Sequence, residues 1–226
     1  MRRLLPLLLL LLALSACGGD DDGGGETSAA PTTTAAAEPE PTTGCRDVEQ
    51  PEARTPPTLE QPSEILAEDM TYTATIRTSC GDFSITLDQN ASPKAVASFV
   101  ALAEADYFDG TVFHRIVPGF VIQGGDPTGT GSGGPGYTTV DTPAQTTTYE
   151  EGIVAMAKAG NEPPGAAGSQ FFVVTAADAG LPPEYAVIGK VADGLDVVQR
   201  IGALGDPQTE LPTQPVVIED ISVAIS

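Results

Sequence analysis

Apolar and polar residues begin to alternate regularly near Thr71. Residues 72–78 and 83–87 each alternate, and the turn residues Cys80-Gly81-Asp82 separate them, which predicts a β-hairpin. Further short apolar runs predict strands at 110–116, 120–123, 153–157, 171–175, 187–191 and 216–225. Many short strands with few helices predict a β-barrel or a β-sandwich.

Two segments have helical periodicity instead. Ser92-Pro93 is typical of a helix start, with serine as the N-cap and proline at the first helical position. The residues that follow place an apolar stripe on one face, made of Val96, Phe99, Val100 and Ala103. A second helix is predicted at 193–203, with Val197, Val198 and Ile201 on one face.

The N-terminus has the pattern of an export signal. Met1-Arg2-Arg3 is basic, and residues 4–14 are almost all leucine, too few to span a bilayer that needs about 20 residues. The ending Leu14-Ser15-Ala16-Cys17 resembles a bacterial lipobox. We therefore expect a lipoprotein signal peptide at 1–16, a lipid on Cys17 and attachment to the outer face of the cell membrane. The alternative is an ordinary cleaved signal that a cysteine happens to follow.

Composition divides the rest of the chain. Residues 17–44 are acidic and rich in Gly, Thr, Pro and Ala without periodicity, which predicts a disordered tether. Residues 45–70 are Pro-rich and predict an extended arm, and residues 71–226 form the folded domain. The net charge of −21 argues against nucleic acid or anionic lipid as a partner, so the membrane anchor must be the lipid itself.

Two cysteines remain besides Cys17. Export exposes Cys45 and Cys80 to an oxidising compartment, where we expect them to form a disulfide, although free thiols stay an alternative. Neither lies near a histidine or in a Cys-x-x-Cys pair. The sequence therefore suggests no metal site and no cofactor.

Tests for common catalytic motifs are mostly negative. His114 is the only histidine, and no serine lies in a Gly-x-Ser-x-Gly elbow. The more informative residues are Arg115 and Gln123, which interrupt apolar runs that read as buried strands. Strand interiors rarely hold such residues unless their polar ends face a partner or a cleft.

Several motifs in order resemble the cyclophilin family of peptidyl-prolyl isomerases over residues 71–226. They are Phe113-His114-Arg115, Pro118-Gly119-Phe120, Gln123-Gly124-Gly125-Asp126, Gly152-Ile153-Val154-Ala155-Met156-Ala157 and Gly168-Ser169-Gln170-Phe171-Phe172. The resemblance implies a closed eight-stranded antiparallel β-barrel capped by two α-helices. It also implies a rotamase that acts on proline-containing polypeptides, which we expect to be a monomer.

The resemblance also implies the site residues. Arg115 lies at the catalytic arginine, and Gln123 at the glutamine that bonds the substrate carbonyl and helps to orient the arginine. Ala157 and Lys158 lie on a segment whose backbone pairs with substrate, and Gln170 is a polar residue near the groove. Further substrate-binding positions are Phe120, Met156, Phe172, Leu181 and Tyr185.

The chain departs from the family at two positions of the expected site. Gly180 stands where many cyclophilins carry a tryptophan that contacts cyclosporin, so we expect weakened cyclosporin binding. Tyr185 replaces a pocket histidine of many eukaryotic members. Two other functions stay open: a non-catalytic proline-binding chaperone or scaffold on the cell surface, and a solute-binding lipoprotein, which would need two lobes and more residues.

Overall fold

The computed structural model describes residues 43–226, so the predicted signal peptide, Cys17 and most of the predicted tether lie outside the described residues. Nine strands form one antiparallel sheet in the order β3-β11-β1-β2-β10-β7-β9-β5-β4. Their bounds are β1 Tyr72–Thr78, β2 Gly81–Leu87, β3 Thr111–Val112, β4 Arg115–Val117, β5 Val121–Gly124, β7 Ile153–Met156, β9 Phe171–Val174, β10 Val187–Asp193 and β11 Val217–Ile225. Two short strands form a second sheet, β6 Thr139–Val140 and β8 Ala166–Ala167.

The expectation of a closed eight-stranded barrel is wrong. The sheet is a strongly curled half-barrel whose end strands are β3 and β4. The predicted strand at 110–116 is broken at Phe113-His114, because its first part pairs with β11 and its last part pairs with β5. Phe113 still donates its backbone N–H to Val216 (3.0 Å), and the chain then bends away from β11 to reach β5. The two end strands are therefore joined by two residues of covalent chain.

Helix α1, Pro93–Glu104, begins where the Ser-Pro pair predicts. Ser92 is the N-cap residue, as predicted, but it makes no side-chain cap hydrogen bond. Asp141 from the loop after β6 supplies a capping hydrogen bond instead and accepts the backbone N–H of Ala95 at 2.7 Å. A carboxylate at a helix N-terminus is favoured by both the free N–H groups and the helix dipole.

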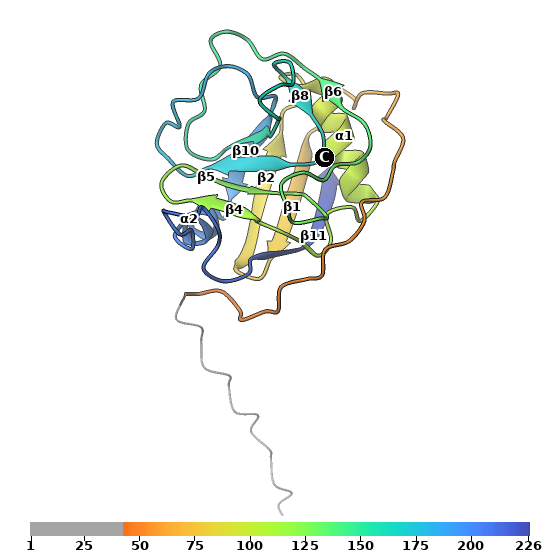
Figure 1. Cartoon of the computed structure of the whole chain (residues 1–226). Coiled ribbons are helices and arrows are strands. Elements are labelled where there is room, and N and C mark those ends of the chain that lie inside the picture. The colour runs from red at the N-terminus through yellow and green to blue at the C-terminus, as the bar shows by residue number, and fades with distance from the viewer. Residues whose placement is uncertain (1–42) are drawn as a thin grey trace, which may run out of the picture. The chain divides into compact units, whose positions relative to one another are not determined.

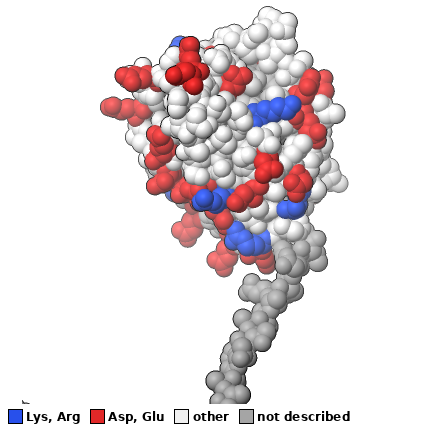
Figure 2. All heavy atoms as spheres, turned by 180° about the vertical axis from the view of Figure 1, so that it is seen from behind, with Lys and Arg blue, Asp and Glu red and all other residues white. Residues whose placement is uncertain are grey.

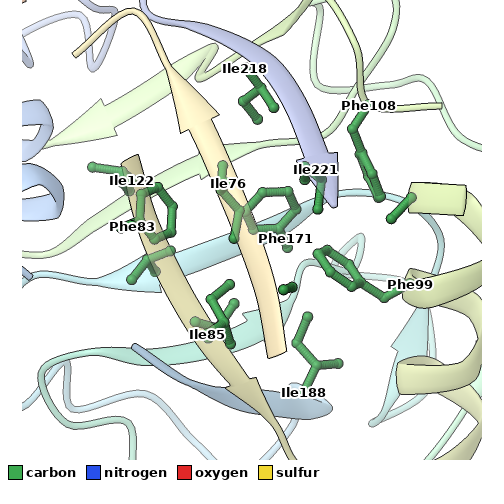
Figure 3. Close-up of a cluster of buried hydrophobic side chains, with 14 of the residues drawn as sticks. Ile76, Phe83, Ile85, Phe99, Phe108, Ile122, Phe171, Ile188, Ile218 and Ile221 are labelled. Atoms are coloured by element: carbon green, nitrogen blue, oxygen red, sulfur yellow. The ribbon is translucent and has the colours of Figure 1, made fainter. Parts of the chain in front are cut away.

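The core lies between α1 and the concave face of the sheet, as Figure 3 shows. Phe99 of α1 points at Phe171 of β9, with the ring centroids 5.6 Å apart and the ring planes nearly perpendicular. Alternate residues of the β1–β2 hairpin, including Ile76, Phe83 and Ile85, are fully buried against them. Burial of each such side chain stabilises the fold by about 1.5–3 kcal/mol. The hairpin and its inward-facing residues are as the alternation predicts.

Helix α2, Leu195–Gly202, packs against β2, β4 and β5 and so supports the strands that carry Arg115 and Gln123. It begins after Gly194, whose φ of 76° and closeness to the carbonyl oxygen of Asp82 leave no room for a side chain. The predicted apolar face is buried as expected.

The Cys45–Cys80 disulfide is present, as expected for these two cysteines. From it, residues 46–70 cross the domain without helix or strand (orange in Figure 1). Backbone N–H groups of Arg54 and Leu59 donate to Pro127 and Pro135, both at 3.1 Å. The Arg54 guanidinium also donates to carbonyl oxygens that follow α1. The arm is therefore bonded to the loop between β5 and β6.

Acidic side chains are spread over the face in Figure 2, with only isolated basic groups among them. This distribution matches the net charge of the whole chain. Among residues 43–226, no helix has the length and apolar character needed to cross a membrane.

Candidate active site

The strand pairing places a row of predicted site residues side by side on the outer face of the sheet. Arg115 of β4 lies opposite Gln123 of β5, which in turn lies opposite Phe172 of β9. Phe172 lies opposite Ala155 of β7. Because side chains alternate between the two faces of a strand, residues in such a row share one face. The interior face of the same strands supplies the core.

A cavity of about 190 Å³ opens over this row. It brings together all but two of the residues expected to act on substrate. Its lining comprises Arg115, Phe120, Val121, Gln123, Ala157, Lys158, Phe172, Leu181 and Tyr185.

Phe120 reaches the cavity because of the turn between β4 and β5. Gly119 has a φ of 67°, which glycine adopts without strain. The Phe120 N–H then donates to Val117 at 3.0 Å, and the Phe120 carbonyl accepts the N–H of Thr175 at 2.9 Å. The backbone of Phe120 is thus fixed on both sides, which holds its ring at the wall of the cavity.

Met156 is not at this site. Its side chain is fully buried in the main core, where it lies opposite Phe171. The reason is the two-residue period of β7, which turns Ala155 and Ala157 outward and Met156 inward. Val121, which the sequence interpretation missed, lines the cavity instead. Counting back two positions from Gln123 would have identified it.

A second, larger cavity of about 620 Å³ shares Gln123, Ala157 and Lys158 with the first. Gln170 lies here: it accepts a hydrogen bond from Gln123 Nε2 at 3.0 Å, and its own Nε2 donates to the Gly133 carbonyl at 3.0 Å. The chain of bonds from Gln123 through Gln170 connects β5 to the glycine-rich loop. Gln123 therefore borders both cavities and is linked by hydrogen bonds to the loop that lines the larger one.

Asp126, at the end of β5, holds that glycine-rich loop in place. Its buried carboxylate accepts backbone N–H groups of Gly131, Ser132 and Gly133 at 2.7–3.1 Å, and also bonds Thr128. Burial by itself raises the pKa of Asp126, but these hydrogen bonds outweigh it and lower the pKa below its ordinary value. The carboxylate therefore stays ionised and fixes the wall of the larger cavity.

Arg115 has a partner that the sequence interpretation missed. Its side chain is 35% exposed, and its Nε donates to Glu210 Oε2 at 2.6 Å. Its two terminal nitrogens have no hydrogen-bond partner within residues 43–226. Gln123, which the family resemblance gave an orienting role, is bonded to Gln170 and not to Arg115. No sequence motif linked Glu210, 95 residues away, to the arginine.

Tyr185 closes the opposite side of the smaller cavity. Its ring packs edge-on against Phe172, with centroids 5.4 Å apart. The hydroxyl of buried Tyr149 donates to the Tyr185 carbonyl at 2.8 Å and accepts the Tyr185 N–H at 2.9 Å. Burial raises the pKa of Tyr149, so its hydroxyl keeps the proton that it donates. Tyr149 thereby fixes the backbone that carries the wall.

Lys158 was expected to act through its backbone, but its side chain also has a defined place. Only 4% of the side chain is exposed, and Nζ lies 3.1 Å from a carboxylate oxygen of Glu184. Nζ also donates to the carbonyl oxygens of Ala159 and Glu162, and lies 5.7 Å from the Tyr185 ring centroid. Lys158 thus ties the rim at 159–162 to the Tyr185 wall.

His114 precedes Arg115 in the chain but does not line the cavity that contains the arginine. Both ring nitrogens are buried, and neither has a hydrogen-bond partner in the described part of the chain. Burial lowers the pKa of His114, so the ring is neutral at pH 7. Among residues 43–226, no cluster of three or more His, Cys, Asp or Glu side chains is arranged to hold a metal ion.

Comparisons with known proteins agree with this geometry. Residues 73–223 match the profile of the cyclophilin-type peptidyl-prolyl cis-trans isomerase/CLD family. The chain is 41% identical to peptidyl-prolyl cis-trans isomerase A of Mycobacterium tuberculosis, covering 68% of this chain and 93% of that protein. It is 40% identical to peptidyl-prolyl cis-trans isomerase B of Streptomyces anulatus, over 66% of this chain and 95% of that protein.

A solved structure shows the same fold. A Cryptosporidium parvum cyclophilin-type isomerase, crystallised in the presence of the dipeptide Ala-Pro, is 35% identical with a TM-score of 0.62. The match covers 67% of this chain and 98% of that one. The fold, the cavity and the extent of these matches lead to one conclusion: the chain belongs to the cyclophilin-type peptidyl-prolyl cis-trans isomerases.

Proposed function

We propose that this chain is an exported, lipid-anchored prolyl isomerase that acts on extracytoplasmic polypeptides, with Arg115 stabilising the twisted X–Pro bond. The observation that carries the mechanism is the cavity in which Arg115 and Gln123 meet Phe120, Phe172 and Leu181. Its apolar walls suit a pyrrolidine ring, and its polar edge suits the imide that precedes the ring.

The chemistry needs only a well-placed donor. Rotation about the bond faces a barrier of about 18–20 kcal/mol because the planar amide is conjugated. In the twisted state conjugation is lost, and the proline nitrogen gains a lone pair that accepts a hydrogen bond. A fixed cation that bonds this state better than the planar state lowers the barrier. No covalent bond forms or breaks, so no nucleophile or general base is required.

Arg115 and Gln123 contact different parts of the substrate in this mechanism. The terminal nitrogens of Arg115 remain free to donate to the imide, and a guanidinium presents its donors in a rigid planar fork. Gln123 lies directly opposite on β5 and binds the substrate carbonyl, while Phe120 and Phe172 hold the ring. The relative crystallised with Ala-Pro supports proline-containing peptides as substrates.

Two features support export. The lipobox-like Leu14-Ser15-Ala16-Cys17 follows an apolar signal. Independently, the buried Cys45–Cys80 disulfide is of a kind that persists in oxidising compartments and is rare in the cytosol. In a host strain, Cys17→Ser should move the protein from the membrane fraction to the soluble fraction. Equal membrane retention of both forms would contradict the lipid anchor.

The mechanism is tested by cis–trans exchange of a short Ala-Pro peptide, followed by NMR. Arg115→Ala should lower kcat/KM by roughly 10²–10³, the scale of losing one preorganised donor. Arg77→Ala is a matched control, because Arg77 is an exposed arginine of β1 that pairs with Asp220 on the neighbouring strand β11. Normal exchange in the Arg115→Ala variant would contradict the mechanism. Absence of exchange in wild type, with the peptide bound, would instead favour the binding-only alternative.

The cyclosporin response tests a departure from the family. Gly180 has a φ of 61°, and a Cβ there would meet no atom within 4 Å. We propose that wild type binds cyclosporin weakly and that Gly180→Trp binds it more tightly despite some backbone strain. The chain has no other tryptophan, so indole fluorescence reports binding directly. Nanomolar inhibition of wild type would contradict this proposal.

A further inference from the structure

We infer that Glu210 is a positioning residue that sets the orientation of the Arg115 guanidinium before substrate binds. The inference rests on the proposed role of Arg115. Its basis is the 2.6 Å bond from Arg115 Nε to Glu210 Oε2, which joins β4 to the turn that precedes β11. The Glu210 side chain is itself partly exposed and does not line the cavity, so it contacts Arg115 from outside the cavity.

The backbone at Glu210 is unusual. Its φ is 59°, a left-handed conformation that side-chain-bearing residues seldom adopt. Asp106 is the only other non-glycine residue with a positive φ among residues 43–226. Glycine or asparagine would occupy this position at lower cost. Such backbone conformations often occur at functional sites, where the strained residue has a role that a relaxed one could not fill.

Backbone hydrogen bonds hold the turn at residues 206–210 next to the strand that carries Arg115. The Glu210 carbonyl accepts the N–H of Ile116, the residue after Arg115, at 2.9 Å. The Glu210 N–H donates to the Asp206 carbonyl at 2.8 Å. The Asp206 carboxylate accepts backbone N–H groups of Thr209 and Gln208, which lower its pKa and keep it ionised. Glu210 is therefore held beside Arg115 by its backbone, independently of its carboxylate.

The bond engages Nε of Arg115, which is not one of the two terminal nitrogens that we propose to donate to the substrate. Binding Nε fixes the plane of the group and leaves the two terminal nitrogens for substrate. A free arginine side chain would have to lose its rotamer freedom when the transition state forms. Glu210 restricts that freedom in advance, so more of the interaction energy is available to the twisted state. Gln123 is not bonded to Arg115 in this chain, which leaves Glu210 as the residue that orients it.

Glu210→Gly removes the carboxylate but is compatible with the backbone conformation of the turn. Glycine accepts the positive φ, so this variant should fold with a urea midpoint no lower than wild type. We expect its kcat for the Ala-Pro peptide to fall about tenfold while KM stays within about twofold. Glu210→Gln keeps a side-chain oxygen that accepts the Nε–H, and it should recover part of the loss. Asp220→Asn is the matched control, because Asp220 pairs with Arg77 away from both cavities.

A spectroscopic readout distinguishes positioning from general stability. In ¹⁵N-labelled protein the Arg115 Nε–H signal should be shielded from exchange with water in wild type and broadened or lost in Glu210→Gly. The Arg77 Nε–H signal should be the same in both proteins.

Three outcomes overturn the inference. They are unchanged or faster turnover in Glu210→Gly, an unchanged Arg115 Nε–H signal, and a further loss of turnover when Glu210→Gly is added to Arg115→Ala. The last test uses the expectation that a positioning residue has no effect once its target is removed. If Arg115→Ala is fully active, the proposed mechanism fails first. If Arg115→Ala is inactive and Glu210→Gly is normal, only the positioning role fails.

Discussion

Gln123 donates a side-chain N–H to the side-chain oxygen Oε1 of Gln170 at 3.0 Å, and Gln123 lines both cavities whereas Gln170 lines only the larger one. Gln170 in turn donates to Gly133 on the glycine-rich loop. The orientation of Gln123, which we propose to bind the substrate, is therefore coupled to the wall of the neighbouring cavity.

Gln170→Ala should lower kcat/KM about tenfold, because it removes two hydrogen bonds of about 1 kcal/mol each and frees Gln123 to rotate. We expect most of this decrease in kcat/KM to come from a higher KM. The decrease should be larger for peptides that extend before the proline than for the dipeptide. Peptide exchange by NMR measures both. Gln199→Ala is the control, since that amide bonds Thr175 outside the cavities. Equal losses in the two variants would contradict a specific role for Gln170.

Lys158→Met should destabilise the domain by about 1–2 kcal/mol. The buried ammonium loses its pairing with Glu184 and its bonds to two carbonyl oxygens, although Glu184 itself can return to water. Urea unfolding measures the change. Lys190→Met, at an exposed position of β10, should stay within about 0.5 kcal/mol of wild type. If both variants match wild type, the Lys158 contacts contribute nothing to stability.

Removing the disulfide should reduce stability without affecting catalysis. The bridge closes a loop of 35 residues, for which the chain-entropy model gives about 3–4 kcal/mol. The double variant Cys45→Ala/Cys80→Ala should lose this amount in urea unfolding and retain its peptide-exchange rate at low temperature. Reduced wild type is the control and should behave in the same way. An exchange rate that falls in parallel with stability would show that the arm contributes to the site.

His114 should make stability depend on pH below about 6.5. Burial lowers the pKa of His114 in the folded state. The nearby Asp126 carboxylate raises this pKa and the Arg115 cation lowers it, but burial has the largest effect. The unfolded chain therefore binds a proton first as pH falls, so stability is lost from pH 6.5 down to the folded pKa. Urea midpoints between pH 8 and 5 measure this slope. His114→Gln should flatten it, and an unchanged slope in that variant would assign it to other groups.

The periodic segments were the predictable part of the fold. The β1–β2 hairpin and both helices follow from alternation and helical spacing, because each buries one face against the core. The break at Phe113-His114 was not predictable, since both halves of that run are apolar and only the pairing partners differ. The strands β6 and β8 were missed because two residues cannot display a period.

The residues of the site also differ in whether the sequence could predict them. The cavity-lining positions of Arg115, Gln123 and Phe172 could be predicted because these residues lie in dense motifs on the strands β4, β5 and β9. Met156 was misplaced because a motif gives proximity in sequence but not the side of the strand. Glu210 and Glu184 were missed because each reaches the site from a loop distant in sequence from the motif that it contacts. Loop residues of this kind carry no local pattern that marks their contacts.

The position of the disulfide has a mechanical consequence. If the segment before Cys45 tethers the domain, any force on that segment enters at Cys45 and passes through the sulfur atoms to Cys80, at the turn between β1 and β2. Arg200 of α2 donates a hydrogen bond to the Cys80 carbonyl at 2.8 Å, so part of this force passes to α2. The arm lies inside the covalent loop, so its hydrogen bonds to the β5–β6 loop are shielded from tension. Tension on the tether would therefore bypass the arm and leave its contacts with the wall of the larger cavity in place.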